Sequence, residues 1–162
     1  SQQKSGLSFL WLSAVAFVLD LLTKYIVVQK FALYESVNIL PVFNLTYVHN
    51  TGAAFSFLAD HDGWQKFFFI GLAVVISSML IYFMAKSEAA QKLQNAAYAL
   101  IIGGALANAV DRAYNGYVID FFDFYWRDWR YPVFNVADIA ICVGAALIAL
   151  DAFKQGKKQE QK

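Results

Sequence analysis

Two aspartates stand in strongly apolar surroundings, and they are the residues best placed for chemistry. Asp120 lies in the segment Val-Ile-Asp-Phe at 118–121, and Asp138 ends the segment Phe-Asn-Val-Ala-Asp at 134–138. A carboxylate near lipid costs about 2.5–3.5 kcal/mol on insertion scales, so it usually faces the bundle interior and has a function there. Two of them close in sequence predict a site built from a carboxylate pair.

Such a pair can activate water. Because like charges repel, one member keeps its proton while the other is ionised. The ionised member can take a proton from water, while the protonated member hydrogen-bonds a carbonyl group. Asp120 and Asp138 therefore predict peptide hydrolysis without a metal or a covalent intermediate. Asp123 is the natural rival of Asp120, and we interpret it as a surface carboxylate that water solvates.

Other polar residues share helix faces at short spacing. Asp20 and Lys24 are four residues apart, which predicts a structural ion pair on the first helix. Asn135 and Asp138 are three residues apart, so Asn135 can donate a hydrogen bond toward whatever Asp138 binds.

A third group lies near the end of another apolar run. Asn108, Asp111 and Arg112 share one helix face, and Asp111 is expected to position Arg112 or a helix end. The preceding Gly-Gly-Ala at 103–105 allows close helix approach. These clusters can converge at one depth, near the outer membrane interface.

Composition places the chain among membrane proteins. Of its 162 residues 59% are hydrophobic and 15% charged, against about 25% charged in soluble domains. The length suits one membrane domain over 1–162, and the net charge of +1 gives no basic surface of the kind that binds nucleic acid.

We interpret Cys142 as a small buried hydrophobic residue. His49 and His61 lack zinc-site spacing, so we expect no metal and no cofactor.

Four segments are long enough to span a bilayer, at about 7–28, 66–85, 93–111 and 134–153. Pro41 and Pro132 both lie outside them, as uninterrupted helices require. Lysines and arginines are nearly balanced between the two sides, but the C-terminal cluster at 154–162 favours cytoplasmic termini. The two larger connections, 29–65 and 112–133, then face outward.

Both outward connections carry structure. Residues 42–48 alternate and are rich in β-branched and aromatic types, which predicts a strand, followed by a turn and a second short strand to about Leu58. We expect a small extracytoplasmic sheet over about 34–60. Residues 121–131 interleave aromatics with charges, which fits an interfacial segment that anchors in the headgroups or forms a lip over a lateral opening.

The chain resembles the bacterial lipoprotein signal peptidases, the type II signal peptidases, nearly end to end. Five blocks carry the resemblance in the family's order: Asp-Leu-Leu-Thr-Lys at 20–24, Asn-Thr-Gly-Ala-Ala-Phe at 50–55, Gly-Gly-Ala-Leu-Ala-Asn-Ala-Val-Asp-Arg at 103–112, and the segments 118–121 and 134–138. One departure is Ala107, where the family usually has glycine.

The resemblance implies an integral membrane, mainly α fold of four transmembrane helices, with an outer sheet and an interfacial helix. It implies an aspartic endopeptidase that removes signal peptides from diacylglyceryl-modified prolipoproteins, cutting just before the lipidated cysteine. Asp120 and Asp138 match the family's catalytic pair. Its substrate-contacting or supporting positions match Asn50, Gly52, Asn108, Asp111, Arg112 and Asn135, and its structural pair matches Asp20 and Lys24.

We accordingly expect a monomer in the bacterial cytoplasmic (inner) membrane. Its partners would be lipid-modified prolipoproteins and membrane lipids, and its active site would lie near the outer face. The alternative function is a small four-helix transporter or proton-coupled carrier. Such proteins bind near the bilayer midplane, whereas the candidates here cluster at span ends. A purely structural scaffold would explain Asp20 and Lys24 but not Asp120.

Overall fold

The structure, a computed structural model, describes residues 4–52 and 64–162 of the chain. In this part it contains four helices long and apolar enough to cross a membrane, which confirms the four predicted spans. A short 3-10 helix, η1 (Gly6–Phe9), leads into the first of them. The long helices are α1 (Leu10–Lys30), α3 (Trp64–Lys86), α4 (Lys92–Asn115) and α5 (Val136–Glu160).

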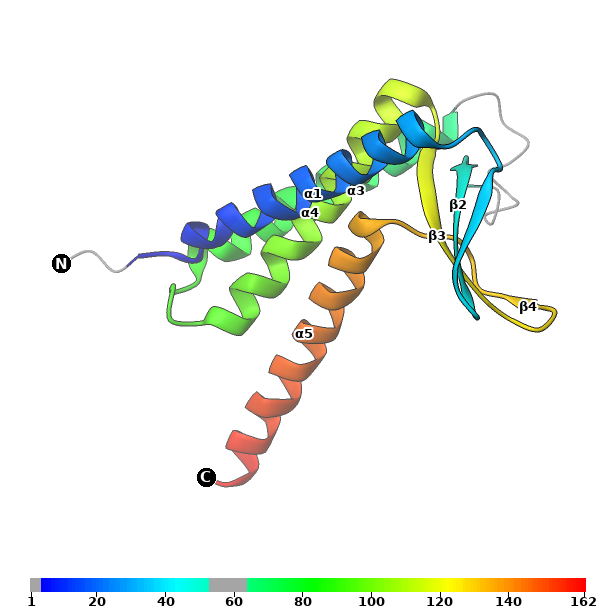
Figure 1. Ribbon diagram of the computed structural model, residues 1–162. Helices are drawn as coiled ribbons and strands as arrows, with labels where there is room; N and C mark the ends of the chain where they lie inside the picture. Colours follow the sequence, from blue (N-terminus) through cyan, green and yellow to red (C-terminus); the bar gives the residue numbers. More distant parts are fainter. Residues whose placement is uncertain (1–3, 53–63) are drawn as a thin grey trace.

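Helix α4 is the centre of the bundle and packs against α1, α3 and α5 (Figure 1). Small residues allow this close packing. A Cβ atom on Gly103 would lie 2.5 Å from the Ser13 carbonyl oxygen on α1, and one on Gly104 would lie 2.5 Å from the Ala137 carbonyl oxygen on α5. Ala107 is completely buried in the same helix, so alanine fits where the resembling family usually has glycine.

A four-stranded antiparallel sheet lies at one end of the helices. Its strands are β1 (Ser36–Leu40), β2 (Phe43–Asn50), β3 (Val118–Trp126) and β4 (Trp129–Arg130), in that spatial order. Strand β2 confirms the strand predicted at 42–48. The second short strand predicted up to Leu58 lies outside the described residues.

Residues 121–131, predicted as an interfacial segment, belong to the sheet and form no helix. These residues form most of β3, a tight turn and β4. The aromatic and β-branched residues of this segment favour an extended chain, and β2 supplies hydrogen-bond partners along its length. The turn is closed by Arg127, whose φ is 56°.

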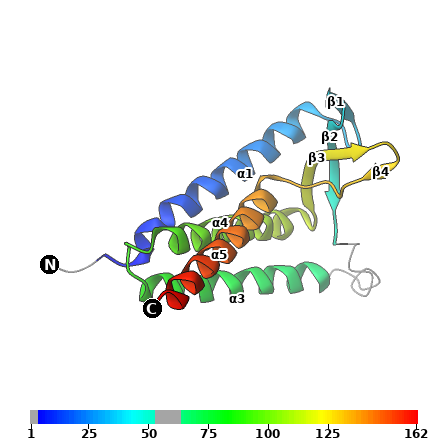
Figure 2. The ribbon, with the colours of Figure 1, turned by 90° about the horizontal axis from the view of Figure 1, so that it is seen from below.

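The sheet is fixed to the end of α1 by an apolar cluster. Val27 of α1 packs with Tyr47 of β2 and with Ile119 and Phe121 of β3, and all four are buried. The start of η1 and the end of α5 lie at the other end of the helices (Figure 2). The sheet therefore covers one end of the bundle, where the candidate residues of α1, α4 and α5 also lie.

Candidate active site

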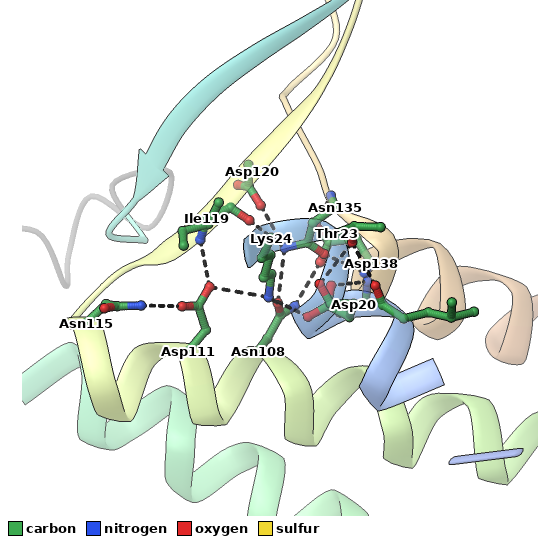
Figure 3. Close-up of polar contacts among 12 residues, drawn as sticks. Asp20, Thr23, Lys24, Asn108, Asp111, Asn115, Ile119, Asp120, Asn135 and Asp138 are labelled. Atoms are coloured by element: carbon green, nitrogen blue, oxygen red, sulfur yellow. Dashed lines mark hydrogen bonds and ion pairs between the residues drawn. The ribbon is translucent and has the colours of Figure 1, made fainter. Parts of the chain in front are cut away.

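The two predicted carboxylates come from elements that meet where the sheet joins the bundle. Asp120 is the third residue of β3 and is 1% exposed. Asp138 lies in the first turn of α5, whose N-cap is Asn135. In Figure 3 the two aspartates lie on either side of Asn135.

Asn135 is bonded to both carboxylates. Its Nδ2 donates to Oδ1 of Asp120 at 2.8 Å, and its backbone N–H donates to Oδ2 of Asp138 at 3.2 Å. Its own Oδ1 accepts from the backbone N–H of Asp138 at 2.8 Å, which completes a capping box. The start of α5 thus depends on the same two residues that set the position of Asp138.

Asn108 connects this pair to the bundle interior. Its Nδ2 donates to Oδ1 of Asp138 at 3.1 Å. Its Oδ1 accepts from Nζ of Lys24 at 2.9 Å and from Nδ2 of Asn135 at 3.1 Å. Because Lys24 holds the amide oxygen, the amide nitrogen of Asn108 is directed at Asp138.

Lys24 is the buried cation of the network. Its Nζ lies 2.6 Å from Oδ2 of Asp20, which confirms the predicted pair, and 3.3 Å from Oδ2 of Asp111. Asp20 also accepts from the backbone N–H of Ala137 at 2.7 Å. This cluster ties α1 to α4 and to the start of α5.

Asp111 supports a helix end, as one of the two expectations had it, and it also holds a residue of β3. Its Oδ2 accepts from the backbone N–H of Ile119 at 2.8 Å, and its Oδ1 accepts from Asn115 at 2.6 Å. It therefore holds the strand residue next to Asp120 and supports the last turn of α4. That helix ends at Gly116, whose φ of 79° is readily adopted by glycine.

The environment of Asp120 favours its protonated form. Burial, and secondly the charge of Asp138, raise the pKa of Asp120 to about 7. A side-chain hydrogen bond from Asn50 and the charges of Lys24 and Arg112 act in the opposite direction. A carboxyl group with this pKa can exchange its proton near neutral pH.

Asn50 and Gly52 reach the site from the end of β2. Asn50 pairs with Val118 and Val48 pairs with Asp120, so Asn50 lies on the Asp120 side of the sheet. Oδ1 of Asn50 accepts from the backbone N–H of Gly52 at 2.9 Å. Gly52 has a φ of 87°, which favours glycine, and this explains why the turn carries that residue.

Arg112 lies at the edge of the network. Its guanidinium carbon lies 4.5 Å from the centre of the Phe69 ring on α3. Sequence reasoning missed Phe69, because it stands in a run of three phenylalanines in an apolar span and no sequence signal separates it from lipid-facing neighbours.

Asp123 is not the solvated surface carboxylate that we expected. It is 3% exposed, accepts from Oγ1 of Thr46 at 2.8 Å, and pairs with Arg130 at 3.2 Å. Residues three apart on a strand point to opposite faces, so Asp123 lies across β3 from Asp120. It is buried because the sheet places Thr46 of β2 and Arg130 of β4 beside it.

A cavity of about 670 Å³ opens beside Asp138. Its walls are otherwise apolar or aromatic and come from β3, β4 and the outer face of α5; they include Phe124, Trp129, Tyr131, Phe134, Ile139 and Cys142. Cys142 is exposed rather than buried as expected, because α5 contacts α4 and α1 on its other side. A carboxyl group at the wall of an apolar cavity suits a substrate with one polar segment between apolar parts.

Comparison with known proteins identifies the family of the chain. The family model described as signal peptidase (SPase) II matches residues 12–154. Lipoprotein signal peptidases of Haemophilus influenzae (strain PittGG) and Actinobacillus succinogenes are 78% and 75% identical over 159 and 158 residues. Each alignment covers 98% of this chain, with 93% and 97% of the relative.

A solved structure titled as a bacterial membrane enzyme superposes with a TM-score of 0.84 at 28% identity, covering 100% of this chain and 98% of that one. The family match spans most of the sequence, including every candidate site residue named above. This chain belongs to the signal peptidase II family.

Proposed function

We propose that this protein is a membrane-embedded endopeptidase that removes signal peptides from lipid-modified prolipoproteins, cutting just before the lipidated cysteine, with Asp120 and Asp138 as its catalytic pair. The observation that carries the proposal is the position of Asn135, which bonds both carboxylates and so holds two acids at one site. The family match and the names of the relatives support the substrate class.

The pair would share one proton near neutral pH, because the pKa of Asp120 is raised to about 7. The ionised carboxylate takes a proton from water, and the water oxygen forms a bond to the scissile carbonyl carbon. The protonated carboxyl donates a hydrogen bond to the carbonyl oxygen. When the tetrahedral intermediate collapses, the C–N bond breaks and the leaving nitrogen takes a proton from the pair.

The supporting residues set the geometry for these steps. Asn108 and Asn135 orient the carboxylates, and Lys24 orients Asn108. Asn50 and Arg112 approach from the sheet and from the end of α4, where they can contact the substrate backbone. Holding reacting groups in place in advance lowers the activation barrier, because the entropy of ordering them is lost when the protein folds and not during the reaction.

The cavity fits the proposed substrate. A signal peptide is apolar on one side of the cut, and the diacylglyceryl group is apolar on the other. The cavity beside Asp138 has apolar walls and one carboxyl group. A substrate helix could thus enter sideways from lipid, while its scissile bond reaches Asp138 at the end of the bundle.

We further propose that both termini are cytoplasmic and that the active site faces the outer side of the inner membrane. The lysine cluster at 154–162 supports this orientation. The position of the start of η1 and of the end of α5, both away from the sheet, supports it too. A carrier function is not favoured, because the family match is to peptidases and the acids cluster at helix ends.

The test uses the full chain purified into liposomes with a synthetic diacylglyceryl prolipoprotein. Mass spectrometry should identify a product that begins at the lipidated cysteine. The matched control is the same peptide without its lipid, which should be cut far more slowly. No cleavage of the lipidated peptide, together with ion or proton flux in liposomes that contain no substrate, would favour the carrier instead.

A further inference from the structure

The ring of Phe69 on α3 contacts the candidate site in two directions. On one side its ring centre lies 4.5 Å from the guanidinium carbon of Arg112. On another side its edge faces Gly52 so closely that a Cβ there would lie 2.8 Å from Cε2 of Phe69. A single side chain therefore touches both the end of α4 and the turn after Asn50.

The contact with Arg112 places an aromatic ring against its guanidinium group. Within residues 4–52 and 64–162 Arg112 forms no ion pair, although its charge acts on both Asp120 and Asp138. A planar guanidinium stacks well on an aromatic face. The ring can thus hold the cation without using its N–H donors.

The contact with Gly52 concerns the turn that carries Asn50. Gly52 has a φ of 87° and donates its N–H to Asn50. The Phe69 ring fills the space that a side chain at 52 would need. Asn50, whose side chain lowers the pKa of Asp120, is therefore held from the α3 side as well as by the sheet.

We propose that Phe69 is a positioning residue of the site, whose ring holds Arg112 beside the two carboxylates and fixes the turn that carries Asn50. The inference rests on the proposed function. It gives α3, which contributes no member to the described polar network around Asp138, a role in the reaction. Phe69 does not touch the reacting atoms; it acts through Arg112 and Asn50.

The test compares Phe69→Leu and Phe69→Met with the matched control Phe67→Leu. Phe67 lies on the same helix turn and is 65% exposed, so its loss should leave kcat and KM as in the wild type. The two Phe69 variants should lower kcat about tenfold, because misplacing a group near the reaction by a fraction of an ångström is costly.

The pH profile separates positioning from a merely structural role. The positive charge of Arg112 favours the ionised form of Asp120. When that charge is no longer held in place, the alkaline limb of kcat/KM should move to higher pH. A structural defect would lower the amount of active protein without moving the limb.

Several outcomes would overturn the inference. They are Phe69 variants that match Phe67→Leu in kcat, variants with reduced kcat but an unmoved alkaline limb, and failure of both variants to fold. Asp120→Asn is measured in the same assay. If it stays active, the proposed carboxylate pair fails; if it is inactive and the Phe69 variants are normal, only the present inference fails.

Discussion

Asn135 donates a hydrogen bond from Nδ2 to Oδ1 of Asp120 at 2.8 Å, across the junction between α5 and β3. The same residue is the N-cap of α5 and accepts from the backbone N–H of Asp138. One side chain thus carries both a structural and a proposed functional interaction, and substitutions can separate them.

Asn135→Ser should separate the cap from the carboxylate contact. Serine caps a helix about as well as asparagine, so the cap is kept. The unfolding midpoint should still fall, because the buried Nδ2 of Asn135 also donates to Asn108 and to the Ile119 carbonyl. The amide donor to Asp120 is lost, and kcat should fall about 100-fold, as for other lost donors at polar sites. Asn135→Ala should show the same kinetic loss and in addition lose about 1 kcal/mol of stability. Normal kcat in the serine variant would contradict the role of this contact.

Lys24→Met should be strongly destabilising. Lys24 is 3% exposed and lies between the carboxylates of Asp20 and Asp111. Removing one partner of a buried ion pair leaves uncompensated charge and costs about 3–5 kcal/mol. Thermal unfolding in detergent measures this. The control is Lys30→Met, at the exposed end of α1, which should change the unfolding midpoint little. Equal unfolding midpoints for the two variants would refute the stabilising role of the buried Lys24 ion pairs.

Gly104→Ala should disturb both packing and activity. Its Cβ would lie 2.5 Å from the carbonyl oxygen of Ala137, next to Asp138. Overpacking of this kind costs about 1–3 kcal/mol and would push the start of α5 away from α4. Gly71→Ala is the matched control, because a Cβ there meets nothing within 4 Å, and it should be neutral or stabilising. The prediction fails if Gly104→Ala is as stable and active as Gly71→Ala.

Activity should fall as pH rises through about 7. Burial, and then the charge of Asp138, raise the pKa of Asp120 to about 7, so the pair loses its shared proton above that pH. The raised pKa of Asp120 also makes the free energy of unfolding depend on pH. A raised folded-state pKa contributes stability that is fully present below the unfolded value of about 3.9 and is lost as pH rises through the folded value. A pH profile of kcat/KM checks the expected fall in activity above about pH 7; a flat profile from pH 6 to 9 would contradict it.

Local patterns were predictable from the sequence. The pairing of Asp20 with Lys24 and the proximity of Asn135 to Asp138 follow from helix spacing alone. The four spans follow from hydropathy. These features need no knowledge of what lies next to each helix.

Features that depend on a distant partner were not predictable. Residues 121–131 carry an interfacial pattern, and only the presence of β2 beside them makes them strands. The burial of Asp123 follows from that same sheet. The stacking of Phe69 on Arg112 joins α3 to α4, and no periodicity in either helix indicates it.

The central claim is that Asp120 and Asp138 act together as the catalytic pair. The most direct measurement is the cleavage rate of a synthetic diacylglyceryl prolipoprotein by purified Asp120→Asn and Asp138→Asn, with Asp123→Asn as the matched control on the opposite face of β3. The account predicts that both pair variants stay folded and lose cleavage by at least about a thousandfold, while Asp123→Asn keeps most of its activity. Near-normal cleavage by a folded Asp120→Asn or Asp138→Asn would contradict the account.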